Sequence, residues 1–157
     1  MRKIHDYILD QQGVNWRELL LPWAWLLPGT VCVWIATRIG DLILVFEDGS
    51  VHMLDTGRGS LERIAASRAE FADLCDQDQN AEDWLAIPLV DDLVAAGHAL
   101  GPGQCYSYRE LPLLGGSYDV ENFRVVTLAE HFKALGPIHE ALKDVPDGTH
   151  VVLKADG

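Results

Sequence analysis

The sequence predicts an α+β protein, a single compact domain in which a mostly antiparallel, twisted sheet is flanked by helices. Three observations support this prediction. The chain has 157 residues, which is enough for one domain with a core. Its β-branched runs are short and are bounded by turn residues. Strands and helices also interleave without the regular spacing of βαβ units, and no internal repeat suggests a solenoid.

The first 30 residues predict a helical lead-in to a region spanning residues 31–157. Ile4–Gln11 fits a short helix that ends at Gly13, and Asn15 is a suitable N-cap for a second short helix. The apolar stretch Leu19–Ala36 has the length of a membrane span, but two prolines and a glycine interrupt it. We therefore expect this stretch to pack in the core, and we expect the same of four tryptophans in or just before it: Trp16, Trp23, Trp25 and Trp34.

A β-hairpin is the clearest local prediction. Val31–Ala36 reads as a first strand, and Leu42–Phe46 and Val51–Leu54 flank the pair Asp48-Gly49. Because glycine accepts the positive φ of a tight turn, Asp-Gly between two apolar runs predicts a hairpin. The run Leu61–Ala65 that follows is ambiguous between strand and helix.

Helices dominate the middle of the chain. The capping-box pattern Ser67–Glu70 predicts a helix over Arg68–Cys75. Asn80 is a candidate cap for a further turn through Trp84, and Leu89–Ala96 fits a helix ended by Gly97.

The second half returns to strands before a last helix. Gln104–Arg109 and Phe123–Val126 read as strands, and the second capping box, Thr127–Glu130, begins a helix. We expect Gly136-Pro137 to kink or break this helix before it resumes to about Lys143. A final strand is predicted over Thr149–Lys154.

The net charge is −12, and most of it comes from one segment. The 40 residues between Arg68 and Arg109 contain no lysine or arginine and eight acidic residues. Such a surface repels nucleic acid and anionic lipid and attracts basic partners, although it can also serve only to keep the protein soluble. The candidate partner-binding residues are Asp76, Asp78, Glu82, Asp83, Trp84, Asp91 and Asp92. Trp84 suits an interface anchor or a core position.

No residue pattern supports catalysis, a metal or another cofactor. The six histidines are far apart in sequence, and we expect them at the surface or half-buried. Ser107 or Cys105 could meet His131 in the fold, but no nucleophile motif surrounds them. Three cysteines without C-x-x-C spacing predict a reducing, cytoplasmic location.

The segment LPLLGGSYDVENF contains Gly115 and Gly116 but lacks the lysine or arginine that a phosphate loop needs. We expect a turn or a close backbone contact there, with Tyr118 packed nearby. Exposed tyrosines beside it (Tyr106, Tyr108 and Tyr118) are a candidate small pocket.

Several motifs together resemble one bacterial family. They are Gly40-Asp41, the hairpin Asp48-Gly49-Ser50-Val51, Gly103-Gln104-Cys105-Tyr106, Leu114-Gly115-Gly116-x-Tyr118 and Gly136-x-Ile138-His139. From about Val31 to its end, the chain resembles the C-terminal domain of type VI secretion immunity proteins of the Tdi type, which protect cells from a secreted DNase toxin.

This resemblance implies a cytoplasmic, non-enzymatic immunity protein. It would bind a cognate basic toxin, with a nuclease as the expected target, and block its active site, without nucleic acid or membrane as a partner. The alternative is a general protein- or small-ligand-binding module.

Overall fold

Four antiparallel strands in chain order form the main sheet. The computed structural model describes residues 4–145, and the predicted strand Thr149–Lys154 lies outside them. The strands are β1 (Val31–Ala36), β2 (Leu42–Phe46), β3 (Val51–Asp55) and β4 (Ser60–Ala65). The β2–β3 hairpin is confirmed, with Gly49 at φ +87° and the Phe46 amide donating to the Ser50 carbonyl at 2.9 Å. The ambiguous run before Ala65 is a strand because it pairs with β3.

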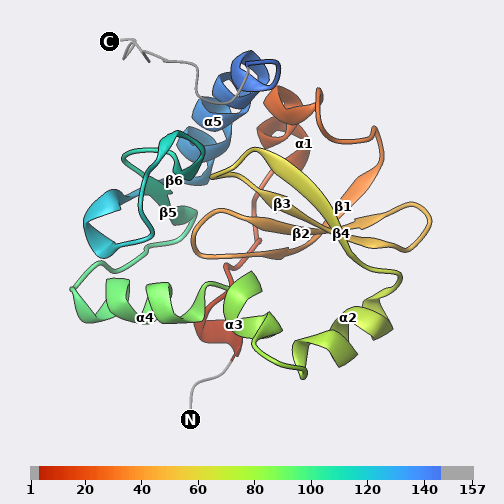
Figure 1. The fold of residues 1–157 in the computed structure, drawn as a ribbon, viewed down its shortest axis with the longest axis horizontal. Helices are drawn as coiled ribbons and strands as arrows, with labels where there is room; N and C mark the ends of the chain where they lie inside the picture. Colours follow the sequence, from red (N-terminus) through yellow and green to blue (C-terminus); the bar gives the residue numbers. More distant parts are fainter. Residues whose placement is uncertain (1–3, 146–157) are drawn as a thin grey trace.

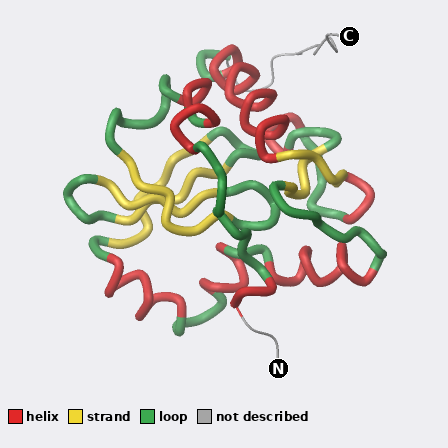
Figure 2. The backbone as a smooth tube through the Cα atoms, turned by 180° about the vertical axis from the view of Figure 1, so that it is seen from behind, coloured by secondary structure: helices red, strands yellow, loops and turns green. Residues whose placement is uncertain are grey.

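Helices cover both faces of this sheet. They are α1 (Trp16–Leu19), α2 (Arg68–Cys75), α3 (Asn80–Trp84), α4 (Ile87–Ala95) and α5 (Leu128–Leu142). Figures 1 and 2 show α1 and α5 on one side of the strands and α2 and α3 on the other. Helix α4 lies below the β5–β6 strands in Figure 1, and its buried Leu89, Val90 and Leu93 belong to the same core cluster as Trp23 and Phe132. The fold is therefore α+β, as predicted.

Successive side chains of β2 point to opposite faces of the sheet and so contribute to two separate core clusters. Leu42 and Leu44 face a large cluster that includes Trp23 and Phe132, whereas Ile43 faces a smaller cluster around Phe71. Both faces of the strand are buried, which explains why its sequence is a continuous apolar run.

A separate two-stranded ribbon connects the sheet to α5. It consists of β5 (Gln104–Tyr108) and β6 (Phe123–Thr127), paired antiparallel. The Tyr106 amide donates to the Arg38 carbonyl at 2.8 Å, so the ribbon is tied to the loop after β1. Short 3-10 turns complete the described chain: η1 (Ile4–Asp6), η2 (Leu21–Trp23), η3 (Pro112–Leu114) and η4 (Val120–Asn122).

The N-terminal helix prediction is wrong beyond one turn. Only Ile4–Asp6 is helical, and Ile8 then forms an antiparallel bridge with Thr37. The Leu9 amide donates to the Ala36 carbonyl at 2.8 Å. A short helix is marginal by itself, so pairing with the end of β1 overrides the local pattern. The Asn15 cap is confirmed, because its side chain accepts from the Glu18 amide.

Asn80 does not cap α3. It is the first residue of that helix, and its side-chain amide instead donates to the Leu74 carbonyl at 2.8 Å. The Leu74 carbonyl also accepts from the Gln77 amide at 3.1 Å, so the Asn80 side chain adds a second hydrogen bond that ties α3 to the end of α2. Ser67 caps α2 as predicted, but the Glu70 carboxylate accepts from the Ala66 amide rather than from the Ser67 amide.

Helix α5 is continuous through Gly136-Pro137, so it does not break there. Its Thr127 capping box is present with both reciprocal bonds. A Cβ on Gly136 would lie 2.7 Å from the Pro22 carbonyl oxygen, so glycine is what allows η2 to pack this closely. The Trp23 indole also donates to the Phe132 carbonyl at 3.0 Å, which fixes η2 against the helix.

Candidate functional site

A buried chain of polar side chains joins the main sheet, the ribbon and α5. His131 lies at its centre, with Nδ1 2.8 Å from the Ser107 hydroxyl and Nε2 2.8 Å from the Thr56 hydroxyl. The Thr56 hydroxyl in turn lies 3.1 Å from Asp41 Oδ1, which also accepts from the Thr56 amide at 2.9 Å. All four residues are buried. The expectation that His131 lies at the surface or is half-buried is therefore wrong.

The hydrogen-bond acceptors around His131 determine which of its ring nitrogens carries the proton. The Thr56 hydroxyl lies 3.1 Å from both the Gly40 carbonyl and Asp41 Oδ1 and donates its proton to one of these acceptors, so it accepts from His131 and Nε2 carries the proton. Nδ1 then accepts from the Ser107 hydroxyl. Burial lowers the pKa of His131 to about 4, which keeps the ring neutral at neutral pH. Burial, followed by the nearby Asp55 charge, raises the pKa of Asp41.

This arrangement of Ser107, His131, Thr56 and Asp41 is better suited to stabilising the fold than to catalysis. A serine and a histidine in contact can form a nucleophile and a base, and the fold does bring Ser107 and His131 together. However, a histidine with a pKa of about 4 is a weak base at neutral pH. Cys105 is no stronger a candidate, because burial raises the pKa of its thiol.

Two glycines make room for the buried histidines. A Cβ on Gly40 would lie 2.1 Å from His131 Nε2, and a Cβ on Gly59 would lie 2.4 Å from the His139 ring. His139 is also buried, contrary to expectation, and its Nε2 donates to the Thr56 carbonyl at 2.7 Å. Sequence reasoning considered the Ser107–His131 contact but missed the rest of the cluster, because its members come from four distant segments. Among the described residues, no group of three His, Cys, Asp or Glu side chains is arranged to hold a metal ion.

The predicted acidic residues lie along one side of the molecule, on and between α2, α3 and α4 (Figure 1). Five are exposed, and within residues 4–145 none of those five is in an ion pair: Asp76, Asp78, Glu82, Asp83 and Asp92. Asp91 differs, because it is half-buried and accepts from the Tyr7 hydroxyl at 2.9 Å. Asp91 therefore connects α4 to the N-terminal segment.

Trp84 is half-buried beneath this acidic side. Its ring stacks on Phe71 at a centroid distance of 5.1 Å, and Phe71 meets Trp34 edge-on, also at 5.1 Å. These contacts belong to the smaller core cluster. Trp84 thus fixes α3 against the sheet and exposes only part of its ring.

The tyrosines are less accessible than predicted. Tyr106 and Tyr108 are buried, and Tyr118 is 42% exposed. The Tyr106 hydroxyl donates to the His98 carbonyl, and Tyr118 packs edge-on against Tyr108 at a centroid distance of 6.2 Å. The expectation of exposed side chains is therefore wrong for Tyr106 and Tyr108, since strand β5 is covered on both faces.

The glycine pair after η3 lies in a turn. Gly115 has φ +98°, and a Cβ on Gly116 would lie 1.9 Å from the Glu110 carbonyl oxygen. Asn122 fixes this turn by donating to the Glu110 and Ser117 carbonyls at 2.8 and 2.7 Å. Both glycines are thus required by backbone geometry.

Residues 65–139 match the family model described as T6SS immunity protein Tdi1, C-terminal. The resemblance is thus found over α2 to α5 and the ribbon, a shorter stretch than the one from Val31 to the chain end that the motifs suggested. No curated protein and no solved structure gave a significant match. The matched stretch contains all the acidic candidate residues and the glycine pair. No helix in residues 4–145 is both long and apolar enough to cross a membrane.

Proposed function

We propose that this protein is a cytoplasmic immunity protein that binds a cognate secreted toxin and neutralises it. The observation that carries the proposal is the match of residues 65–139 to a type VI secretion immunity family. The same stretch holds the long segment without a basic residue, so the family likeness and the acidic surface coincide.

The acidic surface suggests how the toxin is bound. We define it as Asp76, Asp78, Glu82 and Asp83, four exposed carboxylates at the end of α2 and in α3. They lack partner cations in the part of the chain described, so their field acts outward. A nuclease must carry positive charge to hold DNA, and complementary charge accelerates association with such a partner. The proposed target is therefore a nuclease, and occlusion of its DNA path by the acidic surface is the proposed mechanism.

The experiment that tests this function begins with the partner. The tagged protein is purified from its own host at low salt, and any stoichiometric companion is identified by mass spectrometry. We expect a basic protein that is released as salt rises and that degrades DNA in the absence of this chain. A companion without toxic activity, or a cell whose survival of the toxin does not depend on this gene, would contradict the proposal.

A further inference from the structure

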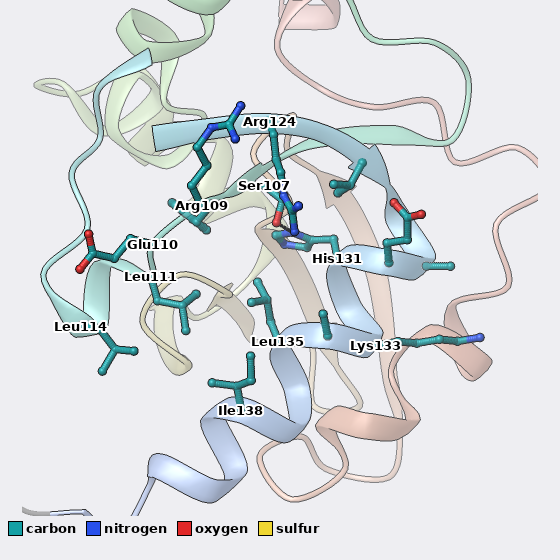
Figure 3. A pocket seen from close by; sticks show the side chains of 15 residues that line it. Ser107, Arg109, Glu110, Leu111, Leu114, Arg124, His131, Lys133, Leu135 and Ile138 are labelled. Carbon is teal, nitrogen blue, oxygen red and sulfur yellow. Dashed lines mark hydrogen bonds between the residues drawn. The ribbon is translucent and has the colours of Figure 1, made fainter. Parts of the chain in front are cut away.

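A groove lies between the ribbon and α5. Its volume is about 1130 Å³, and its walls come from β5, β6, α5 and the Leu111–Leu114 segment (Figure 3). Sites for small organic ligands occupy about 300–1,000 Å³, so the groove is large enough for one. It lies on different residues from the acidic surface proposed to bind the toxin.

One end of the groove is apolar. Leu111 and Leu114 line it on the side of the loop, and Leu135 and Ile138 line it on the side of α5. In Figure 3 these four side chains point toward a common space. Leu114 and Ile138 remain only half-buried, so a ligand there would remove further apolar surface from water.

The other end carries two arginines that form no ion pair within residues 4–145. Arg109 and Arg124 lie where Ser107 and His131 close the groove (Figure 3). Both guanidinium groups are exposed, and no carboxylate in residues 4–145 forms an ion pair with them. Such a site is unusual in a chain with a net charge of −12.

Lys133, Glu130 and Glu110 are the other charged residues that line the groove. The Lys133 ammonium pairs with Glu18 at 3.1 Å, and the Glu130 carboxylate accepts from the Thr127 amide at 3.0 Å. In Figure 3 the Glu110 side chain points away from the leucines. Neither Glu110 nor Glu130 forms an ion pair with Arg109 or Arg124, so both guanidinium groups are available to an anion.

We propose that this groove binds an amphipathic organic anion, with its carboxylate or phosphate on Arg109 and Arg124 and its apolar chain on Leu114, Leu135 and Ile138. Planar guanidinium groups bind both kinds of oxyanion through paired hydrogen bonds. This binding is independent of the proposed immunity role and needs no toxin.

The test is an NMR titration of the ¹⁵N-labelled protein alone with octanoate and, separately, with octyl phosphate, both below their micelle-forming concentrations. We expect saturable shifts of amides around the groove, and the tighter of the two probes identifies the head group. Octan-1-ol, which has no charge, should bind about tenfold more weakly or worse, because it forms no charge-assisted hydrogen bonds.

Variants separate specific from general binding. Arg124→Glu should weaken binding of the charged probe at least about tenfold, and Arg109→Glu serves as a second variant if the first does not fold. Arg63→Glu, an exposed change of equal charge on β4, should leave affinity within about twofold because it lies outside the groove. The proposal is overturned if neither probe saturates, if the shifts fall outside the groove, or if the groove and β4 variants bind alike.

Discussion

At the scale of single residues, the fold depends on buried polar side chains that hydrogen-bond to one another. His131 is surrounded by acceptors and donors from three other segments, and Gly40 leaves the space for its ring. Removing one partner leaves another buried and unsatisfied, which costs more than the hydrogen bond itself contributes.

His131→Gln should destabilise the protein by about 2–4 kcal/mol at pH 7, because it breaks two buried hydrogen bonds. Urea unfolding of both proteins, monitored by circular dichroism, measures the difference. A loss below about 0.5 kcal/mol would show that the cluster does not hold the fold.

The same pair of proteins should differ in pH dependence. The pKa of His131 is lowered from 6.5 to about 4 in the folded protein, so between these values the unfolded chain binds more protons. The wild type therefore loses this contribution as pH falls below 6.5, whereas the variant has no such group. We expect the difference in free energy of unfolding between the wild type and His131→Gln to be about 2 kcal/mol smaller at pH 5 than at pH 7. The raised pKa of Asp41 makes folding more favourable as pH falls, which is opposite to the effect of His131. Because Asp41 is present in both proteins, its effect cancels when their free energies of unfolding are subtracted. A constant gap would contradict a buried neutral histidine.

Gly40→Ala should be far more damaging than Gly97→Ala. Both glycines have positive φ, +82° and +91°, so both substitutions incur the backbone cost of about 1–2 kcal/mol. At Gly97 nothing lies within 4 Å of the new Cβ, whereas at Gly40 it meets the His131 ring. We expect an additional loss of about 2 kcal/mol or more for Gly40→Ala in the same unfolding assay. Equal losses would mean that the ring moves aside freely.

At the scale of elements, the sequence correctly predicted the turns and helix ends that depend only on neighbouring residues. The Asp48-Gly49 hairpin, the Ser67 and Thr127 caps and the stop at Gly97 depend on a few adjacent residues, and all appear where the sequence places them. The pairing of Ile8 with Thr37 depends on contacts between distant segments, and the sequence pattern did not reveal it.

The same distinction between neighbouring and distant residues applies to the candidate sites. The acidic residues could be located from the sequence because they lie close together in it, on and between α2, α3 and α4. The His131 cluster and the groove assemble residues that are tens of positions apart, and no local spacing signals either. Burial of Tyr106 and Tyr108 was missed because both faces of β5 are covered.

Pro137 offers a test of how α5 is held. It lies in the helix interior, where it removes one hydrogen-bond donor, yet the helix continues through it. Because Pro137 is exposed, Pro137→Ala should restore that donor with little loss of packing and raise stability by about 1 kcal/mol or more. Thermal unfolding measures the change. A lower melting temperature would indicate that the proline ring makes a contact on which the helix depends.

At the scale of the whole molecule, charge is distributed unevenly. The side of the molecule formed by α2, α3 and α4 is acidic, and the groove beside α5 ends in two free arginines. This separation permits two independent binding events, one with a cationic protein and one with a small anion. It also predicts that the two can be disrupted separately by substitutions at different sites.

The central claim is that the acidic surface binds the toxin, and the most direct test is the salt dependence of that affinity. The quadruple variant Asp76→Asn, Asp78→Asn, Glu82→Gln and Asp83→Asn removes four charges. A matched control removes four exposed carboxylates elsewhere: Glu47→Gln, Glu62→Gln, Glu121→Gln and Glu140→Gln.

Affinity for the purified toxin is measured for both variants and the wild type from about 50 to 500 mM salt, a range over which the screening of exposed charges changes strongly. We predict that the quadruple variant binds at least about tenfold more weakly at low salt and with a shallower salt dependence, while the control stays close to the wild type. Equal affinities and equal salt slopes for the two variants would contradict the claim and place the toxin-binding surface elsewhere.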